Sequence, residues 1–242
     1  GVTVRASDGR WASAEVLAAE ARILSFAERG RGGGYGAVPD MIATRALIVA
    51  RLDAGQRDAA RHLTMGGDFL TVLTAPAGAG KTTCLGAATR AWQDAGYRVV
   101  GLAPSARAAA ELASATGDRA DTLAKWLHNQ DRLRSLDWFE REWSLPDDRT
   151  VLIVDEASMA STLDLDRLIT QAARAAAKVV LVGDPAQIGV VNGPGGMLAA
   201  LANAGHGVEL TAIHRFAHDW ERDASMALRD GDPSILDVYA EA

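Results

Sequence analysis

A glycine-rich stretch of this sequence has the residue types that bind phosphate. The run Ala75-Pro-Ala-Gly78-Ala79-Gly80-Lys81-Thr82-Thr83 follows a β-prone segment and precedes a helical pattern. Loop amides and a helix N-terminus can point at phosphate oxygens, Lys81 can reach the β and γ phosphates, and the Thr82 hydroxyl can hold magnesium. Ala75 departs from the usual pattern, which has glycine at that position. The alternative is a glycine-rich turn with a solvated lysine, which would leave the motifs described next unexplained.

Two apolar runs later in the chain end in polar residues that suit hydrolysis of a phosphate bond. Residues 151–154 are followed by Asp155 and Glu156, and residues 179–182 by Gly-Asp-Pro-Ala-Gln187. Ligands of open parallel sheets bind beyond the carboxyl ends of the strands. Asp155 can hold magnesium through water, Glu156 can polarise the attacking water, and Gln187 can contact the γ phosphate. Alone, Asp155-Glu156 fits a solvated turn or a helix cap better, and Gly-Asp-Pro is more often only a turn. Together with the glycine-rich loop, they favour ATP and Mg²⁺ as cofactors.

The elements that must position these residues alternate along the chain. β-Prone runs lie at 69–74, 98–102, 151–154, 179–182 and 208–210, and helical patterns lie between them at about 81–95, 105–115, 122–130, 162–176 and 196–204. This alternation predicts βαβ units and a parallel sheet. Helical patterns at 11–29, 38–50 and 54–65 precede the sheet, and another covers 218–229. The charged, tryptophan-rich segment 131–149 is expected to be an insertion over the sheet.

Composition excludes several classes of protein. Hydrophobic residues make up 48% and charged residues 23% of the 242 residues, which excludes a disordered chain. No apolar run is long enough to span a membrane. With 25 basic and 31 acidic residues, the chain cannot have a uniformly basic surface for nucleic acid, although a local basic groove is compatible with that balance. One cysteine, Cys84, excludes an internal disulfide, so we expect a cytoplasmic protein.

The order of the motifs resembles motifs I, II and III of superfamily 1 DNA helicases, most closely the RecD-like, 5′-to-3′ branch. The matching segments are Gly78-Ala-Gly-Lys-Thr-Thr, Asp155-Glu-Ala-Ser and Gly183-Asp-Pro-Ala-Gln. The resemblance covers about 52–230. The segment 11–65 further resembles MobF-type conjugative relaxase-helicases.

Four other segments resemble motifs of the same helicases. Leu52-Asp-Ala-Gly-Gln56 resembles the Q motif, whose glutamine reads adenine, and Leu210-Thr-Ala-Ile-His-Arg215 resembles motif IV, whose arginine reaches the γ phosphate. Ala103-Pro104-Ser105-Ala-Arg107 resembles motif Ia, which meets single-stranded DNA, and Asp121-Thr122-Leu123 matches the next DNA-contact motif. The resemblance thus implies catalytic Glu156, Gln187 and Arg215; nucleotide-binding Gln56, Gly78, Ala79, Gly80, Lys81, Thr82 and Thr83; metal-binding Thr82 and Asp155; and DNA-binding Pro104, Ser105, Arg107 and Thr122.

The resemblance also implies the fold and the partners. We expect an α/β, RecA-like P-loop NTPase domain whose parallel sheet has five or more strands, with the five β-prone runs in the order 5-1-4-3-2. A helical N-terminal segment would occupy 1–50, the motor domain 51–231, and a connection to a second RecA-like domain 232–242. The start of the sequence lacks an initiator methionine, so we expect a piece of a longer protein. Expected partners are single-stranded DNA, the second RecA-like domain and, upstream, a relaxase domain.

Other interpretations remain open at this point. The domain would otherwise be another P-loop DNA-processing ATPase, such as a RecD-like repair helicase or a transposition ATPase, or a vestigial domain that only binds DNA. Gln56 would alternatively be an exposed residue near the start of a helix, and Arg215 would alternatively form an ion pair on the surface. Trp126, Trp138 and Trp143 lie among basic residues and would either stack on single-stranded DNA or, as we favour, pack on the core.

Overall fold

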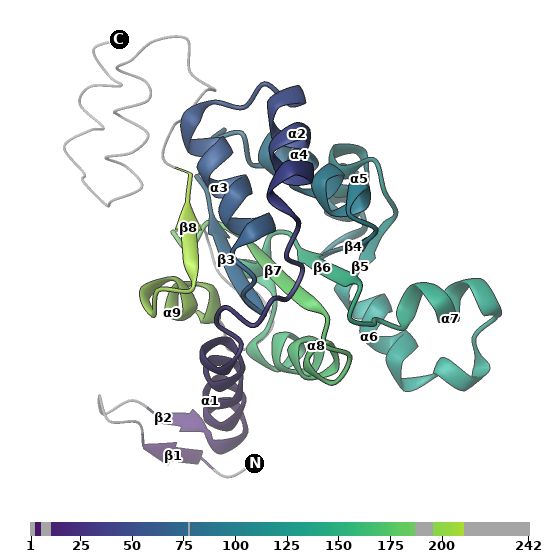
Figure 1. Cartoon of the computed structure of the whole chain (residues 1–242). Helices are drawn as coiled ribbons and strands as arrows, with labels where there is room; N and C mark the ends of the chain where they lie inside the picture. The colour runs from purple at the N-terminus through teal and green to yellow at the C-terminus, as the bar shows by residue number, and fades with distance from the viewer. Residues whose placement is uncertain (1–2, 6–10, 77, 187–195, 211–242) are drawn as a thin grey trace, which may run out of the picture.

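A parallel sheet of six strands forms the centre of the molecule in the computed structural model, which describes residues 3–5, 11–76, 78–186 and 196–210 (Figure 1). The strands are β3 (Leu70–Thr74), β4 (Arg98–Ala103), β5 (Ala120–Thr122), β6 (Thr150–Val154), β7 (Lys178–Gly183) and β8 (Gly207–Glu209). Their order is β5-β4-β6-β7-β3-β8. The five predicted strands therefore lie in the predicted order, which confirms the α/β fold class, and β5 adds an edge strand that periodicity did not predict.

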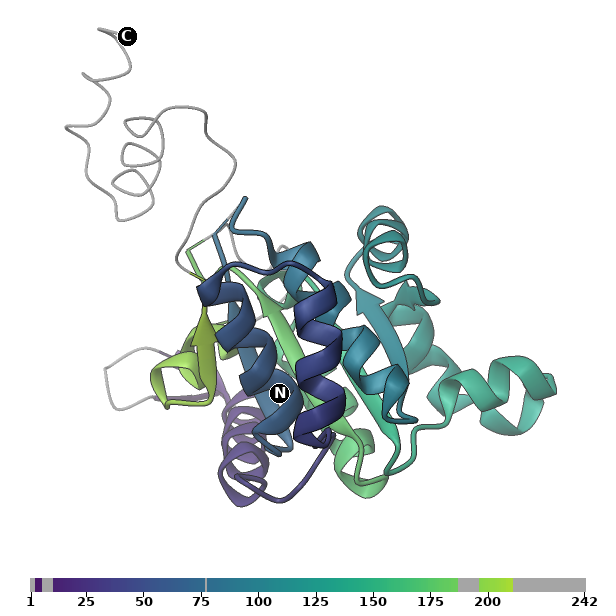
Figure 2. The ribbon, with the colours of Figure 1, turned by 45° about the horizontal axis from the view of Figure 1, so that its top comes forward.

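Helices cover both faces of the sheet (Figure 2). One face carries α2 (Asp40–Val49), α3 (Ala54–Met65), α4 (Lys81–Asp94) and α5 (Ala106–Thr116), and the other carries α1 (Ala14–Arg29), α6 (Leu123–Asp131), α8 (Thr162–Arg174) and α9 (Met197–Asn203). Alternate residues of each strand enter opposite cores: Leu152 packs with α8, and Ile153 packs with α4. Strands buried on both faces explain why the runs at 151–154 and 179–182 are apolar throughout.

The N-terminal region differs from the prediction at its start. The predicted helix from residue 11 is wrong for three residues, because β1 (Thr3–Arg5) pairs antiparallel with β2 (Trp11–Ser13). Helix α1 begins at Ala14, with Ser13 as its N-cap residue in extended conformation. Helices α1 and α2 each bury side chains in one of the two cores, so both belong to the packed body of the sheet.

The insertion does not lie over the sheet as predicted. The short helices η1 (Leu133–Ser135) and α7 (Trp138–Ser144) project beyond the sheet edge on α6 in both views (Figures 1 and 2). Trp126 is buried and Trp143 packs against the core, as we favoured, but Trp138 is 66% exposed. Among the described residues, no helix is long and apolar enough to cross a membrane.

Candidate active site

The glycine-rich loop connects the buried strand β3 to helix α4 at the carboxyl edge of the sheet. Gly78 and Gly80 have φ values of 83° and 74°, which side chains other than glycine resist, and Gly80 is the N-cap residue of α4. The amide of Ala75 donates to the carbonyl oxygen of Gly183 at 3.1 Å, so the loop begins anchored to β7. Free amides at the start of α4 then face the same edge, as phosphate binding requires.

Lys81 begins α4 and meets both acidic residues that follow β6. Its Nζ lies 2.8 Å from Glu156 Oε1 and 3.1 Å from Asp155 Oδ1. The side chain of Lys81 is only 20% exposed, and burial opposes its charged form. The two carboxylates outweigh this effect, so the pKa of Lys81 lies above its usual value and the ammonium stays charged at neutral pH.

The backbone holds Glu156 in an unusual conformation. Its φ of 51° and ψ of 38° lie in the left-handed region, which costs a residue with a side chain about 1 kcal/mol or more. The Glu156 amide donates to Asp155 Oδ1 at 2.9 Å, and a turn of 3-10 helix, η2 (Ala157–Met159), follows. This bend directs the carboxylate of Glu156 to Lys81.

The donor set of this cluster suits magnesium carried by a polyphosphate. No group of three or more His, Cys, Asp or Glu side chains with metal-ligand geometry occurs in the described ranges. Mg²⁺ typically takes one or two protein ligands and fills the remaining positions with phosphate oxygens and water. Thr82, on the first turn of α4, and Asp155 are the residues predicted from the sequence for these two positions, and magnesium binding by them stays a prediction.

Gln56 lies beside this edge, where the structure shows a local role for it. Its side chain accepts from the Asp53 amide at 3.2 Å while Asp53 Oδ1 accepts from the Gln56 amide at 2.8 Å, so the two form a capping box for α3. Gln56 is buried, and its carbonyl oxygen accepts from Cys84 Sγ at 3.6 Å on α4. Burial and the Asp53 carboxylate raise the pKa of the Cys84 thiol to about 12, so this cysteine is unreactive. Adenine recognition by Gln56 stays a prediction.

The candidate DNA residues lie together on the neighbouring part of the same edge. Ala103 pairs with Thr122 across β4 and β5, so Pro104 and Ser105 follow one strand where Thr122 ends the other. Ser105 and Thr122 are also helix caps: their hydroxyls accept from the amides of residues 108 and 125. The side chain of Arg107 is 90% exposed and pairs with Glu111. DNA contact by these residues stays a prediction.

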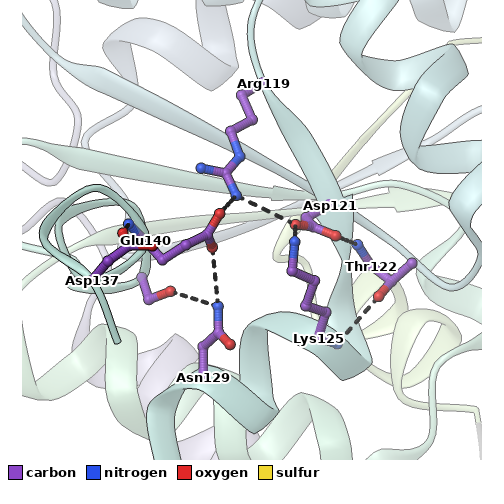
Figure 3. Close-up of polar contacts among 8 residues, drawn as sticks. Arg119, Asp121, Thr122, Lys125, Asn129, Asp137 and Glu140 are labelled. Carbon is purple, nitrogen blue, oxygen red and sulfur yellow. Dashed lines mark hydrogen bonds and ion pairs between the residues drawn. The ribbon is translucent and has the colours of Figure 1, made fainter. Parts of the chain in front are cut away.

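A polar network that the sequence did not reveal joins this edge to the α7 lobe, residues 133–144 (Figure 3). Arg119 lies 2.6 Å from Glu140 and 3.6 Å from Asp121, and its guanidinium stacks over the Trp143 ring at 4.5 Å. Asp121 also pairs with Lys125 at 2.6 Å. The partners Arg119 and Glu140 are 21 positions apart, so no sequence spacing could have paired them.

Two predicted catalytic residues, Gln187 and Arg215, lie outside the described residues. Asp184, just before them, is buried at the end of β7, and its Oδ1 accepts from the Ala186 amide at 3.0 Å. The described part of the site is therefore the loop, Lys81 and the two acidic residues after β6.

Comparison with known proteins identifies the family of the chain. Residues 51–242 match the AAA domain family. The chain belongs to this family. The chain is 37% identical over 191 residues to the probable conjugal transfer protein TraA of Sinorhizobium fredii, and the match covers 78% of the chain and 16% of that protein. It is 34% identical over 58% of the chain to the multifunctional conjugation protein TraI of Escherichia coli K12, covering 8% of TraI.

A third relative is an enzyme subunit whose name does not refer to conjugation. The RecBCD enzyme subunit RecD of Mycolicibacterium smegmatis is 35% identical over 81% of the chain, which covers 38% of RecD. The chain is thus a helicase-type P-loop domain related to conjugative relaxases and RecD helicases. It spans about a sixth of the length of the TraA relative.

Proposed function

We propose that this AAA domain is the first motor domain of an ATP-dependent DNA helicase or translocase that acts in conjugative DNA transfer. The observation that carries the proposal is the cluster of Lys81, Asp155 and Glu156 beside a phosphate-type loop. The relatedness to TraA and TraI supports conjugation as the setting. In this proposal, ATP hydrolysis in the cytoplasm drives movement along single-stranded DNA.

The residues of the cluster divide the work of hydrolysis. The amides of the loop and of α4 bind the phosphates, and Lys81 exchanges its two carboxylate partners for the β and γ phosphate oxygens. Thr82 and Asp155 would hold magnesium, which would supply charge neutralisation on the phosphates. Glu156 accepts the proton of the water that attacks the γ phosphorus, and the leaving oxygen departs with ADP. Phosphoryl transfer depends on positioning and charge more than on covalent chemistry. The groups of the described part of the site supply both.

Single-stranded DNA is proposed to cross the same edge over β4 and β5. The contacts to the DNA backbone there come from Pro104, Ser105, Arg107 and Thr122. Strand β4, which ends at the proposed DNA residues, lies directly beside β6, which ends at the nucleotide cluster. A conformational change at the cluster therefore passes from one strand to its neighbour to reach the DNA. A second RecA-like domain, and an upstream relaxase domain, are proposed as further parts of the polypeptide, because the TraA relative is about six times longer than the matched region.

Substitutions in the cluster test its proposed chemistry. In the two-domain protein, Glu156→Gln keeps the side-chain shape and should leave ATP binding within a few-fold of the parent, while hydrolysis falls by about two orders of magnitude. Lys81→Ala should instead weaken nucleotide binding itself. Near-normal turnover by Glu156→Gln would show that Glu156 is not the base. Unchanged ATP affinity in Lys81→Ala would refute the phosphate-loop assignment.

The dependence on a second domain has its own test. A transition-state arginine supplied from another domain is worth about 10³ to 10⁵ in rate. Residues 1–242 alone should therefore hydrolyse ATP near the background rate, and the two-domain protein should be at least about a hundredfold faster and respond to single-stranded DNA. Equal steady-state rates for the two proteins would refute the split-site proposal.

The RecD relative supports a second candidate, a repair helicase with the same motor. Both candidates predict ATP turnover stimulated by single-stranded DNA, and a vestigial DNA-binding domain predicts none. Transfer of a conjugative plasmid in cells carrying Glu156→Gln separates the first two, because only a conjugation motor requires turnover for transfer.

A further inference from the structure

Gly183 ends β7 between the two strands that carry the candidate cluster. It pairs with Thr74 of β3, and its carbonyl oxygen accepts from the Ala75 amide at 3.1 Å, at the first residue of the phosphate loop. On the other side of β7, strand β6 ends one residue before Asp155. The backbone of Gly183 is therefore hydrogen-bonded directly to the start of the loop that leads to Lys81.

The face of Gly183 that lacks a side chain lies against the turn that follows Glu156. A Cβ built on Gly183 would lie 3.4 Å from the amide nitrogens of both Ala157 and Ser158, and 3.1 Å from Leu198 Cδ2 of α9. Ala157 begins η2, and the Met159 amide donates to the Glu156 carbonyl oxygen at 2.9 Å. The turn thus packs directly against Gly183: a Cβ there would touch η2 at ordinary contact distance, and atoms beyond the Cβ would press on the turn or on Leu198.

We propose that Gly183 is a positioning residue that fixes Glu156 opposite Lys81 by direct backbone contact. The proposal rests on the function proposed above for Glu156. Glu156 is in a left-handed conformation, and its contact with Lys81 at 2.8 Å depends on where η2 lies. A side chain larger than a methyl group at Gly183 displaces η2 away from β7 and takes the Glu156 carboxylate with it, while the hydrogen bond from the Ala75 amide to the Gly183 carbonyl oxygen remains. The base is misplaced and the phosphate loop is not.

Gly183→Val in the two-domain protein tests this role. Displacement of a catalytic group by about 1 Å can cost about 10²-fold, so we expect kcat to fall at least about tenfold. The affinity for a fluorescent ATP analogue should stay within about threefold, because the loop anchor is a backbone contact. Gly183→Ala adds one carbon at ordinary contact distance from η2, so its kcat should stay near the parent value.

Two matched variants separate positioning from loss of packing. Leu198→Ala removes the side chain that a Cβ would strike and should keep kcat near the parent value at a temperature where the protein is folded. Gly183→Val combined with Leu198→Ala relieves the contact with α9 and leaves the contact with η2. The kcat of the double variant should therefore stay as low as that of Gly183→Val alone. Recovery of the parent kcat would mean that Gly183 acts only by packing on α9, which overturns the proposal.

A double-mutant cycle decides whether Gly183 acts through Glu156. With Glu156→Gln present, adding Gly183→Val should reduce kcat no further, because the base is already absent. Additive losses, or a normal kcat in Gly183→Val while Glu156→Gln is inactive, would overturn the positioning role and leave the proposed function standing. Normal turnover in Glu156→Gln alone would refute the proposed function itself. Where Gly183→Val does not fold, the same cycle with Gly183→Ser, whose side chain extends one atom beyond the Cβ, gives the same decision.

Discussion

The most quantitative prediction concerns Lys178, a buried lysine at the start of β7. Its side chain is fully enclosed, and its Nζ donates to the Asp68 carbonyl oxygen at 2.6 Å and to Thr71 Oγ1 at 3.3 Å. Burial, partly offset by the Asp68 carboxylate, lowers the pKa of Lys178 from 10.5 to about 8. The perturbation is Lys178→Met, which keeps the apolar stem and removes the titrating group.

The sign follows from proton binding in the folded and unfolded states. Between the folded pKa of about 8 and the unfolded value of 10.5, the unfolded chain holds the proton more tightly. The free energy of unfolding of the parent therefore rises with pH in this window. From pH 7 to pH 9 the rise from Lys178 amounts to about 1 kcal/mol, since one pKa unit is worth about 1.4 kcal/mol. Lys178→Met lacks this rise, so its stability relative to the parent should decline over the same range.

Chemical denaturation of parent and variant at pH 7, 8 and 9 measures the effect, because subtraction cancels every group that the two proteins share. Lys125→Met is the matched control: Lys125 is half exposed, so water already solvates its ammonium and the same subtraction should change far less. A parent-minus-Lys178→Met difference that stays flat between pH 7 and pH 9 would refute the reasoning. A decline in the stability of the parent relative to the variant as pH rises would refute it as well.

Three further predictions concern the edge of the sheet. Arg107→Ala should lower affinity for single-stranded DNA of any sequence alike, with about two to four phosphate contacts in the salt dependence of the domain; fluorescence anisotropy measures both, and a loss confined to one sequence would mean base reading. Gln56→Ala should cost about 1 kcal/mol in denaturation because it removes half of a capping box, and it should also reduce preference for ATP over GTP; an unchanged preference would leave only the cap. Arg119→Met breaks two ion pairs and a ring contact, so amide hydrogen exchange in α7 should become about tenfold faster while exchange in β6 stays constant. An unchanged exchange rate in α7 would show that the polar network of Figure 3 does not hold α7 in place.

Apart from the three-residue β8, the strands that the sequence predicted are those long enough to show their period. Four consecutive apolar residues at 151–154 and 179–182 could only be buried strands in a βαβ context, and their order in the sheet followed from the resemblance. Strands β2 and β5 have three residues each, which is too short to distinguish alternation from chance. Trp11 was therefore assigned to a helix, and residues 120–122 were seen only as part of a motif.

The candidate site was predictable where its residues are neighbours in sequence and unpredictable where the fold brings them together. Gly78, Gly80 and Lys81 occupy a loop whose spacing carries the chemistry, and the structure gives both glycines the positive φ that this loop requires. The contact between Arg119 and Glu140 depends on where α7 stands beside the sheet, which no local pattern encodes. Trp138 shows the same limit: its helix is amphipathic in sequence, but the lobe leaves this ring in solvent.

The sheet order also explains why the end of β7 must be small. Neighbouring strands lie about 4.8 Å apart, so β3 and β6, with β7 between them, are separated by about 10 Å. Lys81 after β3 and Glu156 after β6 nevertheless meet at 2.8 Å. The two side chains extend toward each other over the end of β7, and the left-handed conformation at Glu156 and the 3-10 turn bring the chain after β6 against Gly183. A side chain larger than a methyl group at Gly183 would press on that turn or on Leu198. The same strand order that gathers the three motifs at one edge therefore favours a small residue where the third motif begins.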